Sequence, residues 1–318
     1  MSSFKLIENI DSDLWERCVK NSDQGSIYLT LNFIKSLGIE YTTYLVIKGE
    51  EPQGGCVVLK DEGGNIFKSP YHFVLSQGFF FNGVKSTDNK IIKTQYEVTD
   101  FLVNALIARY GKLSQSHYRI NDLRPFQWYN YHTPEKGIFT ISIYYTSILS
   151  LDKYKSLEDY LMAIRTVRRQ EFRKVKAKDI KIIDSSDTNI LCDLHRKTFE
   201  RQGIKLPEHE MTLVESIAKT AVENKYGRIN IALMNNIPIS ATLLLFDDKR
   251  AYYQFGATDP DYRDTFASTL LMIENIWRAK TEGFKEFDFV GVNSPNRGDY
   301  KLSFDGVLLP CYGTHYNI

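Results

Sequence analysis

The chain has 318 residues, enough for about two domains that each bury a core of their own. Its hydrophobic content of 43% and charged content of 25% are ordinary for a globular protein, and a formal net charge of only +1 argues against DNA as a partner of the whole surface. Four dispersed cysteines without a C-x-x-C pair and six histidines without ligand spacing argue against a metal or iron–sulfur site.

The chain contains no run of roughly 18 apolar residues of the kind that crosses a bilayer. Acidic residues follow closely on the first six positions, where a secretory signal would be apolar. We therefore expect a cytoplasmic protein without a transmembrane segment.

In the first half, apolar periodicity and turn residues predict alternating helices and strands. The predicted elements are helices at 11–21 and 31–37, strands at 42–47, 54–60 and 66–69, a helix at 95–110 ending at Gly111, and strands at 118–121 and 138–148.

The second half repeats this order of hairpin, strand, helix and strand. The predicted elements are strands at 228–234, 239–246 and 251–257, a helix at 264–282 ending at Gly283, a strand at 285–290 and a last strand pair at 307–316. The repeat predicts an α/β (α+β) protein of two related domains, residues 1–150 and 151–318. Each domain would be a mixed, mostly antiparallel sheet flanked by helices.

A basic helix is predicted between the two halves. Ser156 is typical of an N-cap, and apolar residues from Tyr160 to Val175 indicate one buried face. Eight basic residues stand against two acidic ones between Arg165 and Lys181. Because guanidinium groups match phosphate oxygens, four arginines are candidates for binding the phosphate of a substrate or of transfer RNA; the alternative is a solvated face. These candidates are Arg165, Arg168, Arg169 and Arg173.

Three motifs in the second half carry the clearest chemical signal. They are Gly256-Ala-Thr-Asp-Pro-Asp-Tyr-Arg263 before a helix, Phe287-Asp-Phe-Val-Gly291 at the end of a strand, and Tyr300-Lys-x-x-Phe-x-Gly306 after a loop. Together with the Arg168-Arg169…Lys174 helix, they resemble the GNAT acyltransferase superfamily, and in particular its FemAB-like and CelD/BcsL-like branch. The resemblance covers about residues 156–316.

The resemblance implies a tandem GNAT fold that transfers an acyl or aminoacyl group to an amine, in cell-envelope or polysaccharide metabolism. The donor would be acyl-CoA or aminoacyl-tRNA, with no tightly bound cofactor, and the acceptor a small-molecule or envelope-precursor amine. In GNAT folds two central strands diverge to hold the donor, and here these would be 251–256 and 285–290. The implied donor-binding residues are Phe255, Gly256, Arg263, Thr265 and Ser268.

Three side chains are candidates for the reaction itself. The resemblance places Lys301 near the reacting carbonyl, where its charge offsets a developing oxyanion. Asp288 faces away from its two phenylalanine neighbours and could take a proton from the attacking amine, or anchor a loop. Tyr253 could protonate the leaving group, or only pack between strands. Because no activated serine or cysteine is evident, we expect direct attack by the amine.

The phosphate loop departs from the superfamily pattern of Arg/Gln-x-x-Gly-x-Gly/Ala. Phe266 and Ser268 stand where glycines are expected, and Asp264 adds a negative charge. A phenylalanine side chain obstructs the approach of a diphosphate to the backbone. This departure favours aminoacyl-tRNA over coenzyme A, or a catalytically inactive GNAT-fold protein that binds a ligand or partner. An RNA-binding module that uses the basic helix is a further alternative.

Overall fold

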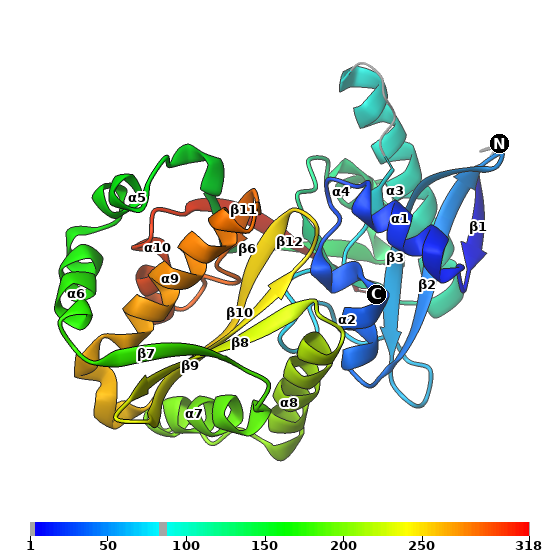
Figure 1. Ribbon diagram of the computed structural model, residues 1–318. Coiled ribbons are helices and arrows are strands. Elements are labelled where there is room, and N and C mark those ends of the chain that lie inside the picture. Colours follow the sequence, from blue (N-terminus) through cyan, green and yellow to red (C-terminus); the bar gives the residue numbers. More distant parts are fainter. Residues whose placement is uncertain (1–3, 83–87, 318) are drawn as a thin grey trace. The chain divides into compact units, whose positions relative to one another are not determined.

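The computed structural model describes residues 4–82 and 88–317 and divides into two compact units, Met1–Tyr144 with Pro310–Ile318, and Tyr145–Leu309 (Figure 1). The division expected at residue 150 assigned residues 310–318 to the second half. They belong to the first unit because β12 (Val307–Asn317) pairs antiparallel with β5 (Ser114–Tyr118), from Cys311 opposite Tyr118 to His315 opposite Ser114. No local sequence pattern indicates a pairing across so much of the chain.

The first unit contains a four-stranded antiparallel sheet in the order β1-β2-β3-β4. Its strands are β1 (Phe4–Glu8), β2 (Glu40–Lys48), β3 (Glu51–Lys60) and β4 (Phe80–Phe81), and its helices are α1 (Ser12–Lys20), α2 (Leu31–Ser36), α3 (Asp88–Tyr110) and α4 (Arg124–Trp128). Alternate residues of β2, Tyr44 and Val46, share one buried cluster with Leu102 and Leu106 of α3, because successive strand residues face opposite sides of a sheet.

Two strand predictions in the first unit were wrong. The strand expected at 66–69 is only an isolated bridge between Lys60 and Ile66. The strand expected at 118–121 ends at Tyr118, because Arg119 takes a left-handed backbone with φ +54°.

The sheet of the second unit has the order β6-β11-β10-β9-β8-β7. Its strands are β6 (Ile138–Ser150), which joins it through residues 148–150, β11 (Glu286–Asp288), β10 (Arg250–Thr258), β9 (Ile237–Phe246), β8 (Gly227–Met234) and β7 (Ile180–Ser185). Neighbouring strands run antiparallel except β10 and β11, which are parallel. The expected mixed, mostly antiparallel sheet is therefore confirmed.

Helices cover both faces of this sheet (Figure 1). They are α5 (Leu157–Ala163), α6 (Thr166–Lys176), α7 (Thr188–Glu200), α8 (Glu208–Glu223), α9 (Ala267–Thr281) and α10 (Pro295–Leu302). Helix α9 contacts β8, β9 and β10 on one face and α6 on its outer side, while α7 and α8 pack together on the opposite face. Leu270 and Ile273 form the predicted buried stripe of α9, which ends before Gly283 at φ +94°.

Three predictions about local structure in the second unit were wrong. The basic segment forms two helices, α5 and α6, because the chain is extended at Arg165, whose backbone N–H donates to the Ser303 carbonyl at 3.0 Å. Tyr300 and Lys301 lie on helix α10 and not on a loop end, and residues 307–316 form one strand. No helix in residues 4–82 and 88–317 combines the length and apolarity needed to span a bilayer.

Candidate functional site

Strands β10 and β11 separate after three residue pairs. Their parallel register ends with Tyr252 opposite Asp288, while β10 continues to Thr258. Beyond β11, Val290 and Gly291 take left-handed backbones with φ +49° and +55°, which carry the chain away from the sheet. Within the described residues, the last part of β10 therefore has no strand partner on this side. This is the divergence expected for residues 251–256 and 285–290.

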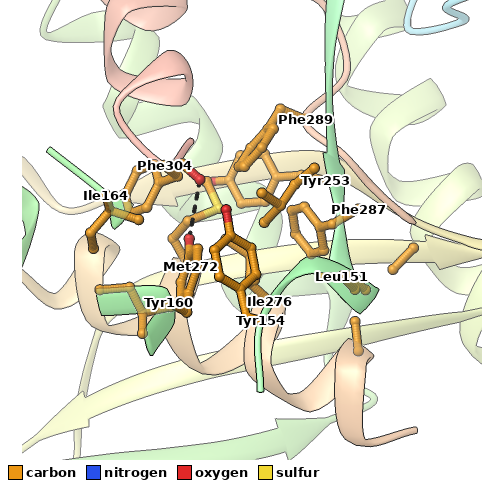
Figure 2. Close-up of a cluster of buried hydrophobic side chains, with 14 of the residues drawn as sticks. Leu151, Tyr154, Tyr160, Ile164, Tyr253, Met272, Ile276, Phe287, Phe289 and Phe304 are labelled. Atoms are coloured by element: carbon orange, nitrogen blue, oxygen red, sulfur yellow. Dashed lines mark hydrogen bonds between the residues drawn. The ribbon is translucent and has the colours of Figure 1, made fainter. Parts of the chain in front are cut away.

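A β-bulge lies at the point of divergence. Tyr253 pairs with Leu244, and Phe255 pairs with the next residue, Leu243, so β10 carries one extra residue here. Two residues apart on a regular strand would share a face. Here Tyr253 joins the cluster on the α9 side, shown in Figure 2, while the Phe255 ring lies 5.4 Å from the ring of His195 on α7. Phe255, predicted to bind the donor, is thus buried on the other face.

The absence of a side chain at Gly256 leaves room for Tyr253, which folds over it. A Cβ added to Gly256 would lie 1.7 Å from the Tyr253 hydroxyl oxygen, so the Tyr253 side chain would have to move. The structure therefore gives Gly256 the role of accommodating Tyr253. Burial raises the pKa of Tyr253, so its hydroxyl keeps its proton near neutral pH.

Lys301 reaches the divergence from α10. A Cβ added to Gly298 would lie 2.3 Å from the Val292 carbonyl oxygen, so glycine allows this helix to pack closely on the turn after β11. The Lys301 Nζ donates to the carbonyl oxygens of Val290 and Gly291, the latter at 3.1 Å. It also lies 5.6 Å from the centroid of the Tyr253 ring. The structure therefore brings together Lys301 and Tyr253, two of the candidate catalytic residues.

Burial lowers the pKa of Lys301 to about 7, because the charged ammonium loses hydration there. The Asp288 carboxylate acts in the opposite direction, and the positive charge of Arg297 lowers the pKa further. The side chain therefore exchanges its proton near neutral pH.

Asp288 is fully buried and carries an unpaired oxygen. Its Oδ1 accepts from the Thr146 hydroxyl at 2.5 Å and from the Val290 backbone N–H at 2.8 Å. Its Oδ2 has no hydrogen-bond partner among the described residues. Burial raises the pKa of Asp288 to about 6, against the lowering effect of these two bonds and of Arg250 and Lys301. Sequence reasoning missed Thr146, which lies 142 residues away on β6 with no local signal.

The predicted donor-binding residues after β10 surround the N-terminus of α9. Arg263 is exposed, Thr265 is buried with its hydroxyl donating to the Tyr262 carbonyl at 2.5 Å, and Ser268 is partly buried. Phe266, at a glycine position of the family loop, keeps a left-handed backbone with φ +61°. A phenylalanine here is strained, because a Cβ disfavours this region.

Two lysines of the α6 region lie at this helix end. The Nζ atoms of Lys174 and Lys178 are 5.7 Å and 5.5 Å from the centroid of the Phe266 ring. The Lys178 Nζ also donates to the Asp264 carbonyl at 2.9 Å. The first N–H groups of a helix lack intrahelical partners and attract anions. The positive charges of the two lysines therefore strengthen the attraction of this helix end for an anion. Both lysines belong to the basic segment predicted from the sequence, but only the structure shows that these two lie at the N-terminus of α9.

Three of the four predicted phosphate-binding arginines have protein partners. The Arg168 guanidinium donates to Glu171 at 2.6 Å and lies 4.9 Å from the Tyr300 ring centroid, while Glu171 also accepts from Thr269 at 2.6 Å. The other three differ in their surroundings: Arg165 pairs with Asp299 at 2.5 Å, Arg169 donates to the Met162 carbonyl at 3.3 Å, and Arg173 is exposed. Arg168 thus joins α6 to α9, a structural role that the Arg168–Glu171 spacing of three residues could have indicated.

The part of the chain that contains Tyr253, Asp288 and Lys301 also matches a known protein family model. Residues 163–302 match the family model described as an acetyltransferase (GNAT) domain. A stretch of 122 residues is 27% identical to the lipid II:glycine glycyltransferase of Staphylococcus haemolyticus (strain JCSC1435). That stretch is 37% of this chain and only 28% of the relative.

Solved structures resemble nearly the whole chain. The crystal structure of FemX has a TM-score of 0.71 at 12% identity, covering 97% of this chain and 96% of that one. A tandem GNAT protein from the clavulanic acid biosynthesis pathway has a TM-score of 0.54 at 11% identity, covering 99% and 98%. The resemblance read from the motifs, and the fold that it implied for both halves, are confirmed.

Proposed function

We propose that this chain, a FemAB-like tandem GNAT protein, transfers an acyl or aminoacyl group from an activated donor to an amine acceptor. The observation that supports this most directly is the meeting of the Lys301 ammonium and the Tyr253 ring where β10 and β11 diverge, with Asp288 at the end of β11 near enough for its charge to act on Lys301. Unpaired strand edges offer main-chain groups to a donor, and an ammonium beside them offers charge to its reacting carbonyl.

The proposed chemistry assigns one step to each side chain. The acceptor amine attacks the donor carbonyl, and a C–N bond forms as the bond to the leaving oxygen or sulfur breaks. The Lys301 ammonium stabilises the negative charge that develops on the carbonyl oxygen. We assign the amine proton to Asp288, which is ionised above a pKa of about 6 and whose buried Oδ2 has no hydrogen-bond partner among the described residues. The Tyr253 hydroxyl, protonated at neutral pH, supplies a proton to the leaving group.

For the donor we favour aminoacyl-tRNA over acyl-CoA. Phe266 blocks the glycine position through which a diphosphate approaches the loop backbone, whereas an aromatic ring is a platform on which a nucleotide base stacks. Lys174 and Lys178 beside this ring supply charge for phosphates. Such donors are cytoplasmic molecules, so the proposal places the protein in the cytoplasm.

For the acceptor we propose an amine of a cell-envelope precursor. The matched relative is by its name a glycyltransferase acting on lipid II, which makes an amine-bearing precursor of that kind the first acceptor to test.

The test measures donor binding and turnover separately. Thermal shift should show stabilisation by tRNA charged with glycine and less by acetyl-CoA, because a ligand that binds only the folded state raises its stability. With lipid II as acceptor, Lys301→Ala should lower turnover on the order of 100-fold, the usual cost of losing oxyanion stabilisation. The matched control, Lys285→Ala, removes a lysine that is 66% exposed and should leave turnover unchanged.

Two outcomes would count against the proposal. If neither donor binds at millimolar concentration while an envelope precursor does, the chain is a binding protein with a GNAT fold. If uncharged RNA binds as tightly as charged tRNA, with an affinity that falls steeply with salt, and no transfer to an amine is detected, the RNA-binding alternative holds.

A further inference from the structure

The C-terminal end of α10, which carries Lys301, is held by the segment from Lys153 to Arg165. The Tyr154 hydroxyl donates to Oδ2 of Asp305, and the Tyr160 hydroxyl donates to the Phe304 carbonyl at 3.3 Å. Figure 2 shows both tyrosines beside Phe304, with the second bond dashed. These bonds come from elements more than 130 residues away in the sequence, and they all end within a few residues of Lys301.

Further contacts support the same end of α10. The Arg165 backbone N–H donates to the Ser303 carbonyl at 3.0 Å, and its guanidinium pairs with Asp299 at 2.5 Å. The Lys153 ammonium pairs with the Asp305 carboxylate at 2.8 Å. The Lys153 side chain is 58% exposed, so this ion pair contributes little by itself.

Asp305 occupies an unusual position in the chain. It takes a left-handed backbone with φ +67° three residues after the last residue of α10, and Gly306 follows. A Cβ on Gly306 would lie 2.2 Å from the Ser147 hydroxyl oxygen, so the chain passes close to β6 here. A strained residue persists where surrounding contacts determine its conformation, and the Tyr154 hydroxyl supplies such a contact.

We propose that Tyr154 and Asp305 form a latch that sets the position of α10 and thereby keeps the Lys301 ammonium on the carbonyl oxygens of Val290 and Gly291. The inference rests on the proposed function, which places Lys301 at the reacting carbonyl. Tyr154 and Asp305 are positioning residues, since neither is assigned a contact with a substrate.

The environment of Tyr154 suits this task. The side chain is 4% exposed and its ring lies 5.1 Å from that of Tyr160, in an edge-on arrangement. Burial, together with the bond to Asp305, raises the pKa of Tyr154 to about 12. The hydroxyl therefore remains a donor throughout the pH range in which Lys301 titrates.

The decisive experiment follows Lys301 itself and needs no substrate. The protein is labelled with acetic anhydride at pH 6 to 11, and the extent of labelling at Lys301 is read by peptide mass spectrometry. In the wild type, labelling should rise with a midpoint near pH 7, set by burial, by Asp288 and by Arg297. Tyr154→Phe keeps the ring but removes the donor, and Asp305→Asn removes the charge of the acceptor.

In both variants the midpoint should move upward by about one pH unit or more, because an ammonium released from its site regains water. The control Lys153→Ala removes the exposed ion pair and the contact of the ammonium with the Tyr154 ring, but leaves the bond between the Tyr154 hydroxyl and Asp305, and should keep the wild-type midpoint. An unchanged midpoint in Tyr154→Phe would overturn the latch, even if Asp305→Asn does not fold.

Turnover then separates the two proposals. If transfer occurs, Tyr154→Phe should lower kcat about tenfold with KM unchanged, since small misplacements of a reacting group are costly. If the wild type transfers nothing, the proposed function fails, and the labelling midpoint still decides whether the latch holds Lys301.

Discussion

The burial of Lys301 makes the stability of the protein depend on pH in a way that Lys301→Met should abolish. Below pH 7 the lysine is protonated in both the folded and the unfolded chain, and the folded protein bears the full cost of a buried ammonium. Between pH 7 and 10.5 the unfolded chain still binds the proton and the folded one does not. The stability of the wild type must therefore rise with pH in this window, relative to a variant without the amine.

The size of the effect follows from the two pKa values. A pKa near 7 in place of 10.5 corresponds to about 5 kcal/mol in total, or about 1.4 kcal/mol for each pH unit. At pH 6 the methionine variant avoids this cost but loses the bonds to Val290 and Gly291, which offset it by roughly 1.5–3 kcal/mol each. The absolute difference at one pH is thus small. The change of that difference with pH is the informative quantity.

Urea unfolding followed by circular dichroism at pH 7.5, 8.5 and 9.5 gives this change directly. The free energy of unfolding of the wild type should rise by about 1.4 kcal/mol relative to that of Lys301→Met at each step. The series begins above pH 7 because Asp288, whose pKa is near 6, titrates below it and responds to the loss of Lys301. Lys285→Met is the control, since its amine is 66% exposed. Parallel curves for wild type and Lys301→Met would refute the burial argument and with it the titration of Lys301 near neutrality.

Two further substitutions test the surroundings of the site. Phe266→Gly gives the loop the glycine of the GNAT superfamily pattern and relieves a φ of +61°, so coenzyme A affinity measured by calorimetry should rise about tenfold; an unaltered affinity would place the obstacle elsewhere. Arg168→Ala leaves the partly buried Glu171 without its cation and should reduce the free energy of unfolding by about 1–3 kcal/mol, whereas exposed Arg173→Ala should change it by less than about 0.5. Equal urea midpoints for these two variants would deny Arg168 its structural role.

Local patterns predicted the elements whose signals lie within a few residues. The apolar stripe of α9 and the glycine that follows it are one example, and the alternation that turns Asp288 away from Phe287 and Phe289 is another. Lys301 was singled out because the motif around it resembles that of the GNAT superfamily. In each case the determinant is contiguous in the sequence.

The remaining features depend on partners that are distant in the chain. The break between α5 and α6 needs Ser303, the second bond of Asp288 needs Thr146, and the latch needs Tyr154 to meet Asp305. The return of β12 to β5 is of the same kind. No periodicity encodes such pairings, since they are fixed only when the sheet forms.

Because of the bulge, the number of residues in β10 determines which face of the sheet each later side chain of the strand occupies. Because one additional residue resets the alternation between Tyr253 and Phe255, shortening the strand there would exchange inward and outward side chains from that point to Thr258. A substitution in this strand changes one side chain, whereas the deletion of one residue would move every side chain from the bulge to Thr258 to the opposite face of the sheet. Natural variation within β10 should therefore consist of replacements, with insertions and deletions confined to the connections on either side.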